Sequence, residues 1–201
     1  MQAGLPGELH LSEPRLGGEP GRSACEIPAT ARVRETMNFR NRICQTLHDE
    51  HLTNIALLQR VEQLLAAQGR TPPSDNQVVQ RLLSDLGSGM ASEVKRHFDF
   101  EESALFTYLD SIGESTIGAH LTQEHSMLRP LIADLCETAH AVSERGFDTG
   151  SWSQFRRLGA ELCGQMSAHI HKEEMALLPL IDESMDSETE SQLYQDYMEN
   201  A

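Results

Sequence analysis

The chain has 201 residues, of which 16 are Lys or Arg and 31 are Asp or Glu, which gives a formal net charge of −15 at pH 7. This excess of negative charge repels phosphate backbones and anionic lipid headgroups, so we expect neither nucleic acid nor a membrane as a partner. No stretch approaches the roughly 20 apolar residues needed to span a bilayer, and no apolar run follows the few positive charges near the start, which favours a cytoplasmic location.

The cysteines also narrow the class of protein. Cys25, Cys44, Cys136 and Cys163 lie far apart and form no CxxC pair. This spacing matches neither a zinc ribbon nor a secreted disulfide framework. We therefore expect three of the four to be reduced residues of the core.

Composition divides the chain into three parts. Residues 1–36 hold five Gly and four Pro and few large apolar side chains, which predicts a flexible N-terminal extension. In residues 37–185, apolar residues recur at spacings of three and four, the period of helices that bury one face. Residues 186–201 are rich in acidic side chains, and we expect an acidic C-terminal tail that is a solvated end or a short surface helix.

Residues 37–185 predict four long helices. They cover about residues 38–68, 74–111, 115–146 and 151–182. Gly69 and Pro72 stop the first helix, Ser74 is the expected N-cap of the second, and Gly146 ends the third. Because the loops between them are short, neighbouring helices should run antiparallel. The predicted fold is an all-α, antiparallel, up-and-down four-helix bundle.

Polar residues interrupt the apolar stripe of each predicted helix, although they are costly to bury. The first and third helices each carry one histidine in the stripe, and the second and fourth each carry a His-x-x-x-Glu pair. Residues four apart on a helix lie side by side on one face. The six residues are His51, His97, Glu101, His125, His169 and Glu173.

The second half of this pattern repeats the first. The segments HFDFEESALFTYLD (97–110) and HIHKEEMALLPLID (169–182) share His, two Glu, Ala, Leu and Asp at equal positions, and Glu50-His51 recurs as Glu124-His125. A histidine followed by two glutamates at this spacing is expected by chance roughly 0.1 times in a chain of this composition, yet it occurs twice in register. The bundle is therefore predicted to have an internal two-fold pseudo-repeat.

The six polar residues are predicted to meet at one level of the bundle. In each pair of consecutive helices, the distance from one polar residue to the end of its helix differs by only ~5 to 8 Å, at ~1.5 Å per residue, from the distance between the start of the next helix and its polar residue. Four imidazoles and two carboxylates in a dry core need a cation among them. Each half would supply two nitrogens to one ion, and the two carboxylates would bridge ions roughly 3.5 to 4 Å apart. Mixed ligands with open positions favour iron over zinc or magnesium.

At these residues the sequence resembles the hemerythrin-like (HHE cation-binding) domain family. Its members carry a histidine on the first helix, HxxxE on the second, a histidine on the third and HxxxE on the fourth. The resemblance covers about residues 38–185 and implies a four-helix bundle with two iron ions (Fe²⁺ or Fe³⁺), joined by carboxylates and an oxo or hydroxo bridge. The implied metal ligands are the six residues named above. Members bind dioxygen, sense oxygen or iron, or handle peroxide and nitric oxide, so we expect O2, NO or peroxide as the ligand and sensing or detoxification as the outcome.

One position departs from the oxygen-carrying members of the family. Those members have a further histidine one turn before the ligand of the third helix, where this chain has Leu121. The difference argues against a reversible oxygen carrier. Two alternatives stay open. One is a di-iron protein that repairs iron-sulfur clusters; such proteins usually carry a cysteine-bearing N-terminal domain, and the Gly/Pro-rich extension here offers only Cys25, which counts against it. The other is a metal-binding or iron-homeostasis module without catalysis.

Three further residues lie close to the predicted ligands. His48 is about 60° around the helix from His51, and we expect it behind a ligand or at the rim of the site. Glu102 and Glu174 stand ~140° from the preceding ligand histidine. We expect both to face water or to pair with neighbours, with Glu174 as the alternative bridging carboxylate.

Overall fold

The computed structural model describes residues 38–199, and these residues form helices joined by short turns, without a strand among them. The elements are α1 (Arg42–Gln68), α2 (Gln77–Asp85), η2 (Leu86–Met90), α3 (Ala91–Phe100), η3 (Glu101–Leu105), α4 (Phe106–Ser111), α5 (Ser115–Arg145), α6 (Thr149–Lys172), η4 (Glu173–Leu177), α7 (Leu178–Ser184) and α8 (Ser187–Glu199). The three η elements are π-helical turns. The extension expected over residues 1–36, with its Cys25, lies outside the described residues.

The π-helical turns join shorter helices into longer ones. The segment from α2 to α4 runs without a break through η2 and η3, and α6 continues through η4 into α7. With α1, α5 and α8 this makes five helical segments within residues 38–199. None of their helices is long and apolar enough to cross a membrane.

Local chemistry sets the helix ends, in places a few residues from the predicted ones. Ser74 is not the N-cap of α2. The side chain of Asn76 accepts the backbone N–H groups of Val78 and Val79 instead, so the helix begins at Gln77. Asp148 forms a capping box that starts α6 before the predicted Ser151. The predicted stops after α1 and α5 are confirmed, because Gly69 (φ 54°) and Gly146 (φ 74°) take conformations that favour glycine.

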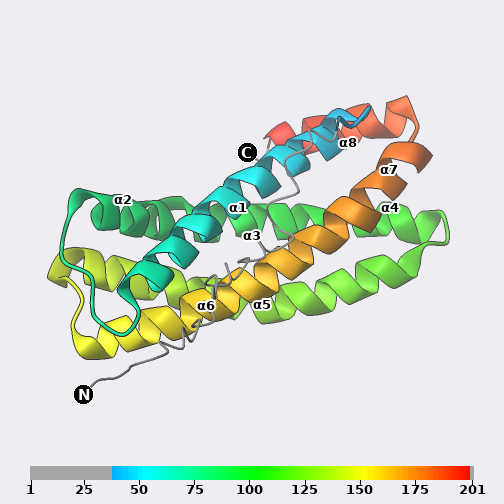
Figure 1. The fold of residues 1–201 in the computed structure, drawn as a ribbon. Helices are drawn as coiled ribbons and strands as arrows, with labels where there is room; N and C mark the ends of the chain where they lie inside the picture. The colour runs from blue at the N-terminus through cyan, green and yellow to red at the C-terminus, as the bar shows by residue number, and fades with distance from the viewer. Residues whose placement is uncertain (1–37, 200–201) are drawn as a thin grey trace, which may run out of the picture. The chain divides into compact units, whose positions relative to one another are not determined.

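The helices pack side by side as a bundle (Figure 1). Helix α5 contacts α6 on one side and the α2–α4 segment on the other, and α1 contacts α6, α2 and α7. Helix α8 lies along the first half of α1 (Figure 1). Each long helix therefore faces two others, which allows residues from all of them to meet in the interior.

The apolar core is divided into two clusters by a polar layer. One cluster gathers residues such as Leu58, Val94 and Leu128, and the other gathers residues such as Leu47, Leu105 and Leu121. Along α1, His51 lies between Leu47 of one cluster and Leu58 of the other, and the other interior histidines take corresponding positions in their helices. The buried polar residues thus lie between two apolar clusters that shield them from water.

The structure also accounts for the cysteines of residues 38–199. Cys44, Cys136 and Cys163 are free and buried, which confirms the prediction of three reduced core residues. Burial raises the pKa of the Cys163 thiol to about 12, so the thiol stays protonated at neutral pH. We therefore expect these cysteines to act as core residues.

The acidic C-terminal segment forms helix α8. Tyr197 and Glu190 are buried, and the Glu190 carboxylate accepts hydrogen bonds from the backbone N–H and the guanidinium of Arg42. The hydrogen bonds from Arg42, and then its charge, hold the pKa of Glu190 below its usual range. The segment is therefore packed against α1 through specific contacts.

Candidate metal centre

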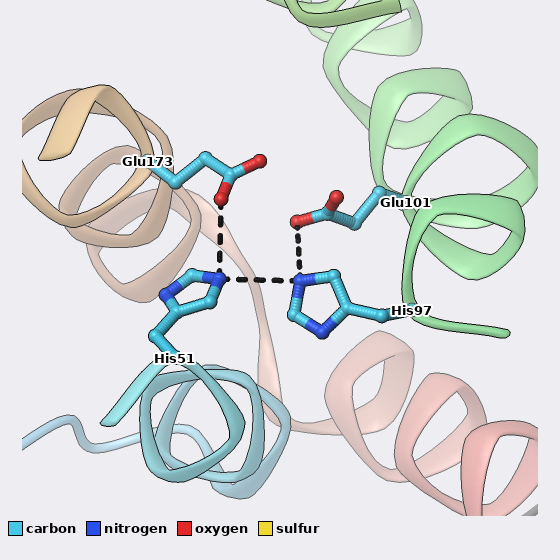
Figure 2. Close-up of side chains that lie close together, drawn as sticks. All are labelled: His51, His97, Glu101 and Glu173. Atoms are coloured by element: carbon cyan, nitrogen blue, oxygen red, sulfur yellow. Dashed lines mark hydrogen bonds and ion pairs between the residues drawn. The ribbon is translucent and has the colours of Figure 1, made fainter. Parts of the chain in front are cut away.

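The structure brings all six sequence-predicted ligands together in the bundle interior, and each of them is at most 3% exposed. We call them the inner cluster: His51, His97, Glu101, His125, His169 and Glu173. They fall into two groups of four residues, and within each group one ligand atom per residue lies within 4.8 Å of the others. His51 and His97 belong to one group and His125 and His169 to the other, while Glu101 and Glu173 belong to both. Figure 2 shows the first group, contributed by α1, α3, η3 and η4, with its nitrogens and oxygens turned toward one another.

The imidazole Nε2 atoms face each other in pairs. The Nε2 atoms of His51 and His97 are 3.1 Å apart, and so are those of His125 and His169. Two Nε2 atoms so close together need a positive charge between them, a shared proton or a cation, because their lone pairs repel. Each pair therefore marks one position that a cation can take.

Each inner carboxylate extends from one group of histidines to the other. Glu101 Oε1 is 3.3 Å from His97 Nε2, and Glu101 Oε2 is 3.4 Å from His125 Nε2. Glu173 Oε2 is 3.1 Å from His51 Nε2, and Glu173 Oε1 is 2.8 Å from His169 Nε2. Each glutamate thus offers one oxygen to each pair of imidazoles. This is the arrangement by which a carboxylate can bridge two ions.

These four carboxylate oxygens are buried and accept no hydrogen bond of normal geometry within the described residues. A buried carboxylate without donors is strongly destabilising unless a cation neutralises it. The donor set of Nε2 and carboxylate oxygen atoms suits iron, since iron in proteins takes mixed imidazole and carboxylate ligands. The residues present therefore fit a pair of such ions.

A second layer of carboxylates holds the histidines from behind. Each histidine Nδ1 donates to one of four outer carboxylates: His51 to Glu174 (2.6 Å), His97 to Glu50 (2.8 Å), His125 to Glu102 (2.7 Å) and His169 to Glu124 (3.0 Å). An ionised carboxylate can only accept, so the proton of each neutral ring lies on Nδ1. Every Nε2 lone pair is then directed at the inner cluster, and the ring is fixed in the tautomer that a metal ligand requires.

The inner cluster attracts positive charge. Burial acts to lower the pKa of His51, but its contacts with Glu173 and Glu174 outweigh burial and raise that pKa to about 9. Burial likewise opposes the charged form of His97, and the charge of Glu101 raises its pKa to about 10. The histidines in turn hold the pKa of Glu173 well below its usual range, although burial acts to raise it. In the metal-free protein protons balance the carboxylates, and a bound cation would displace them.

The backbone widens at both inner glutamates. The π-helical turns η3 and η4 begin at Glu101 and Glu173, whose carbonyls accept the N–H groups of Phe106 and Leu178 five residues ahead. Isolated π-helical turns are frequent at functional sites. The residue that follows each inner glutamate, Glu102 or Glu174, contacts a histidine of a neighbouring helix.

The structure distinguishes between the possibilities for Glu174. We expected it to face water or to pair with neighbours, with a role as the alternative bridging carboxylate. It is only 2% exposed and pairs with two neighbours, since it accepts the Nδ1–H groups of His48 (2.8 Å) and His51 (2.6 Å). It belongs to neither group of the inner cluster. Glu102 is partly exposed and pairs with His125 and Arg129, as one of the two predicted possibilities stated.

His48 lies behind a predicted ligand, as expected. It is buried, and its Nδ1 contacts Glu174 rather than the inner cluster. Sequence reasoning missed the roles of Glu50 and Glu124, which support histidines on neighbouring helices. The sequence did hold a sign of these roles, because both halves of the repeat contain the dipeptide Glu-His and not the histidine alone.

Taken together, the fold and this site define a helical-bundle protein with a buried His/Glu cluster that can hold cations. Residues 116–199 match the family described as "Hemerythrin HHE cation binding domain". The predicted resemblance to the hemerythrin-like family is thereby confirmed over this part of the chain. No curated protein and no solved structure gives a significant match. The match supports cation binding and includes the second group's His125, His169 and Glu173.

Proposed function

We propose that the inner cluster holds two iron ions and presents them to a small ligand, O2, NO or peroxide, for sensing or detoxification. The observation that carries the proposal is the placement of Glu101 and Glu173, each of which offers one oxygen to each pair of imidazoles. Two carboxylates shared between two sets of nitrogens match the bridging ligands of paired metal sites. The match to the cation-binding family supports the same conclusion.

The roles of the protein residues follow from their contacts. The four imidazoles supply Nε2 atoms, two to each ion, and the outer carboxylates keep the rings in that tautomer. Glu101 and Glu173 join the two positions and balance their charge. The surrounding apolar clusters exclude water, which strengthens every electrostatic interaction in the site.

Bound iron supplies electron transfer and open ligand positions to which a diatomic molecule or peroxide can bind. Each group offers one ligand atom from each of four residues, fewer than the six positions of an octahedral ion. Leu121, one turn before His125, is fully buried and adds no ligand atom. This arrangement favours ligand handling over the reversible oxygen carriage of relatives that have a histidine there.

We also propose that the bundle is an antiparallel, up-and-down four-helix bundle with an internal two-fold pseudo-repeat, to which α8 is added. Support comes from the hydrogen bonds. Glu50 supports His97 as Glu124 supports His169, and Glu102 supports His125 as Glu174 supports His51. Equivalent residues of the two sequence repeats therefore make equivalent contacts.

The test is the iron content of single variants after reconstitution with Fe²⁺ under nitrogen. We expect His97→Ala and Glu173→Ala to lose most of the iron, because each removes a ligand and leaves buried groups unpaired. The matched control is His171→Ala, since His171 lies two residues from His169 but is exposed. Iron retained at the control level in both site variants would overturn the assignment.

A further inference from the structure

Helix α8 reaches the metal centre through one side chain. Tyr197 is only 2% exposed, and its hydroxyl donates to Glu50 Oε2 at 2.7 Å. The same oxygen accepts the Nδ1–H of His97 at 2.8 Å. A single carboxylate oxygen thus joins the C-terminal helix to a predicted metal ligand.

The ring of Tyr197 contacts two other side chains. Its centroid lies 4.8 Å from the guanidinium carbon of Arg96 and 4.5 Å from the ring centroid of Phe100. Arg96 also contacts Glu50 Oε1 at 2.6 Å. These contacts fix the direction of the hydroxyl, so it bonds the carboxylate at one defined place.

The helix that carries Tyr197 is itself anchored at its other end. Glu190 is buried and binds the guanidinium of Arg42 at 2.9 Å and its backbone N–H at 2.9 Å. The side chain of Asp186 accepts two backbone N–H groups of the first helical turn, those of Glu188 and Thr189. Both ends of α8 are therefore fixed to the bundle or capped.

The other half of the site has a different arrangement. Glu124, which supports His169 as Glu50 supports His97, is contacted by Lys172 and His120. The side chains of Lys172 and His120 are 42% and 57% exposed. The buried hydroxyl of Tyr197 therefore donates to Glu50, whereas the partners of Glu124 besides His169 are the more exposed Lys172 and His120.

We propose that Tyr197 is a positioning residue of the metal centre, which acts through Glu50 on His97 and places one ion of the pair under the control of helix α8. This inference rests on the proposed function. Without the hydroxyl, the Glu50 carboxylate loses one of its two fixing contacts at Oε2, and the orientation of the His97 ring is less restricted. The ion held by His51 and His97 should then be released more readily, while the ion held by His125 and His169 should not.

The test compares Tyr197→Phe with Tyr194→Phe in the full-length, iron-loaded protein. Tyr194 is on the same helix, and its ring keeps its contact with Arg42 when the hydroxyl is removed. Iron release to an excess of ferrozine is followed by absorption, and Mössbauer spectra of the partly depleted protein show whether a single uncoupled ion remains. We expect one of the two ions to leave Tyr197→Phe roughly tenfold faster than it leaves the unaltered protein. Tenfold is the lower limit of the usual effect of removing a group that hydrogen-bonds a metal ligand. Tyr194→Phe should match the unaltered protein.

A double variant tests the proposed route. Glu50→Gln alone should speed loss of the same ion, and adding Tyr197→Phe to it should produce no further change. If iron leaves both tyrosine variants at the same rate, or if Tyr197→Phe speeds the release of both ions equally, the role of Tyr197 is wrong but the proposal of two bound irons is unaffected. An unaltered protein that takes up no iron would overturn the proposed function and this inference with it.

Discussion

Replacing Glu174 with glutamine removes a buried negative charge that supports two histidines. Its oxygens accept from His51 at 2.6 Å and from His48 at 2.8 Å, and its side chain is 3% exposed. A glutamine of the same shape can still accept one hydrogen bond, but its amide nitrogen faces the other imidazole as a donor. We therefore expect the fold to persist and the affinity for metal to fall.

The magnitude follows from the contacts. Groups that orient a metal ligand contribute about 10- to 100-fold in metal affinity, or about 1.4 to 2.7 kcal/mol. Both oxygens of Glu174 are engaged and water does not screen them, so we expect Glu174→Gln near the upper limit, roughly 100-fold. Glu102 has the equivalent position in the repeat, but its side chain is 32% exposed and shares its charge with Arg129. Glu102→Gln should weaken binding by roughly tenfold.

The assay is competition for Fe²⁺ against a chelator of known affinity, with iron and protein quantified after separation. The unaltered protein and both variants are compared at one pH and ionic strength. If Glu174→Gln binds iron as tightly as the unaltered protein, or if Glu102→Gln is the weaker of the two variants, the argument from burial and hydrogen bonding is wrong.

Three other predictions address packing, protonation and the N-terminal segment. Gly118→Ala should lower the melting temperature, because a Cβ there would lie 3.0 Å from Phe106 Cβ. A Cβ at Gly164 meets nothing within 4 Å, so Gly164→Ala should stabilise its helix by up to about 1 kcal/mol. Circular dichroism melts in which Gly118→Ala is the more stable variant would contradict this. Because the pKa of His97 is raised to about 10, its stabilisation of the metal-free protein is complete below about pH 6.5 and is lost as the pH rises through about 10. Melts of the metal-free protein should show this decline and those of the iron-loaded protein should not, and a flat profile for both would refute the assignment of the proton. Deleting residues 1–36 should leave melting temperature and iron content nearly unchanged, since their composition offers few side chains for the core; a large loss of either would count against this.

Sequence periodicity was sufficient to select the residues that meet in the interior. His51 and His125 interrupt apolar stripes, and the two His-x-x-x-Glu pairs follow the same period, so an inward direction could be assigned to each residue. Two of the predicted helix stops, Gly69 and Gly146, could also be assigned from local chemistry. The duplication within the sequence added the information that these residues lie at equivalent positions.

The positions that sequence reasoning missed depend on non-local contacts or on the exact start of a helix. The expected pairing of Glu174 left its partners unnamed, because its contacts with His48 and His51 join segments that lie far apart in the chain. The buried role of Tyr197 depends on how α8 packs on the bundle, and an acidic composition carries no signal of that packing. The N-cap of α2 differed from the predicted one by two residues, because Ser74 and Asn76 are both good caps and only one lies where the helix starts.

The most direct test of the central claim is the iron-to-protein ratio of the full-length protein after anaerobic loading with Fe²⁺ and removal of free metal, combined with a Mössbauer spectrum of the same sample after oxidation by air. The account predicts about two irons per chain, magnetically coupled in the oxidised sample, because Glu101 and Glu173 each offer one oxygen to both pairs of imidazoles. A protein that holds no iron, or a single iron with no coupled partner at saturating metal, would contradict it.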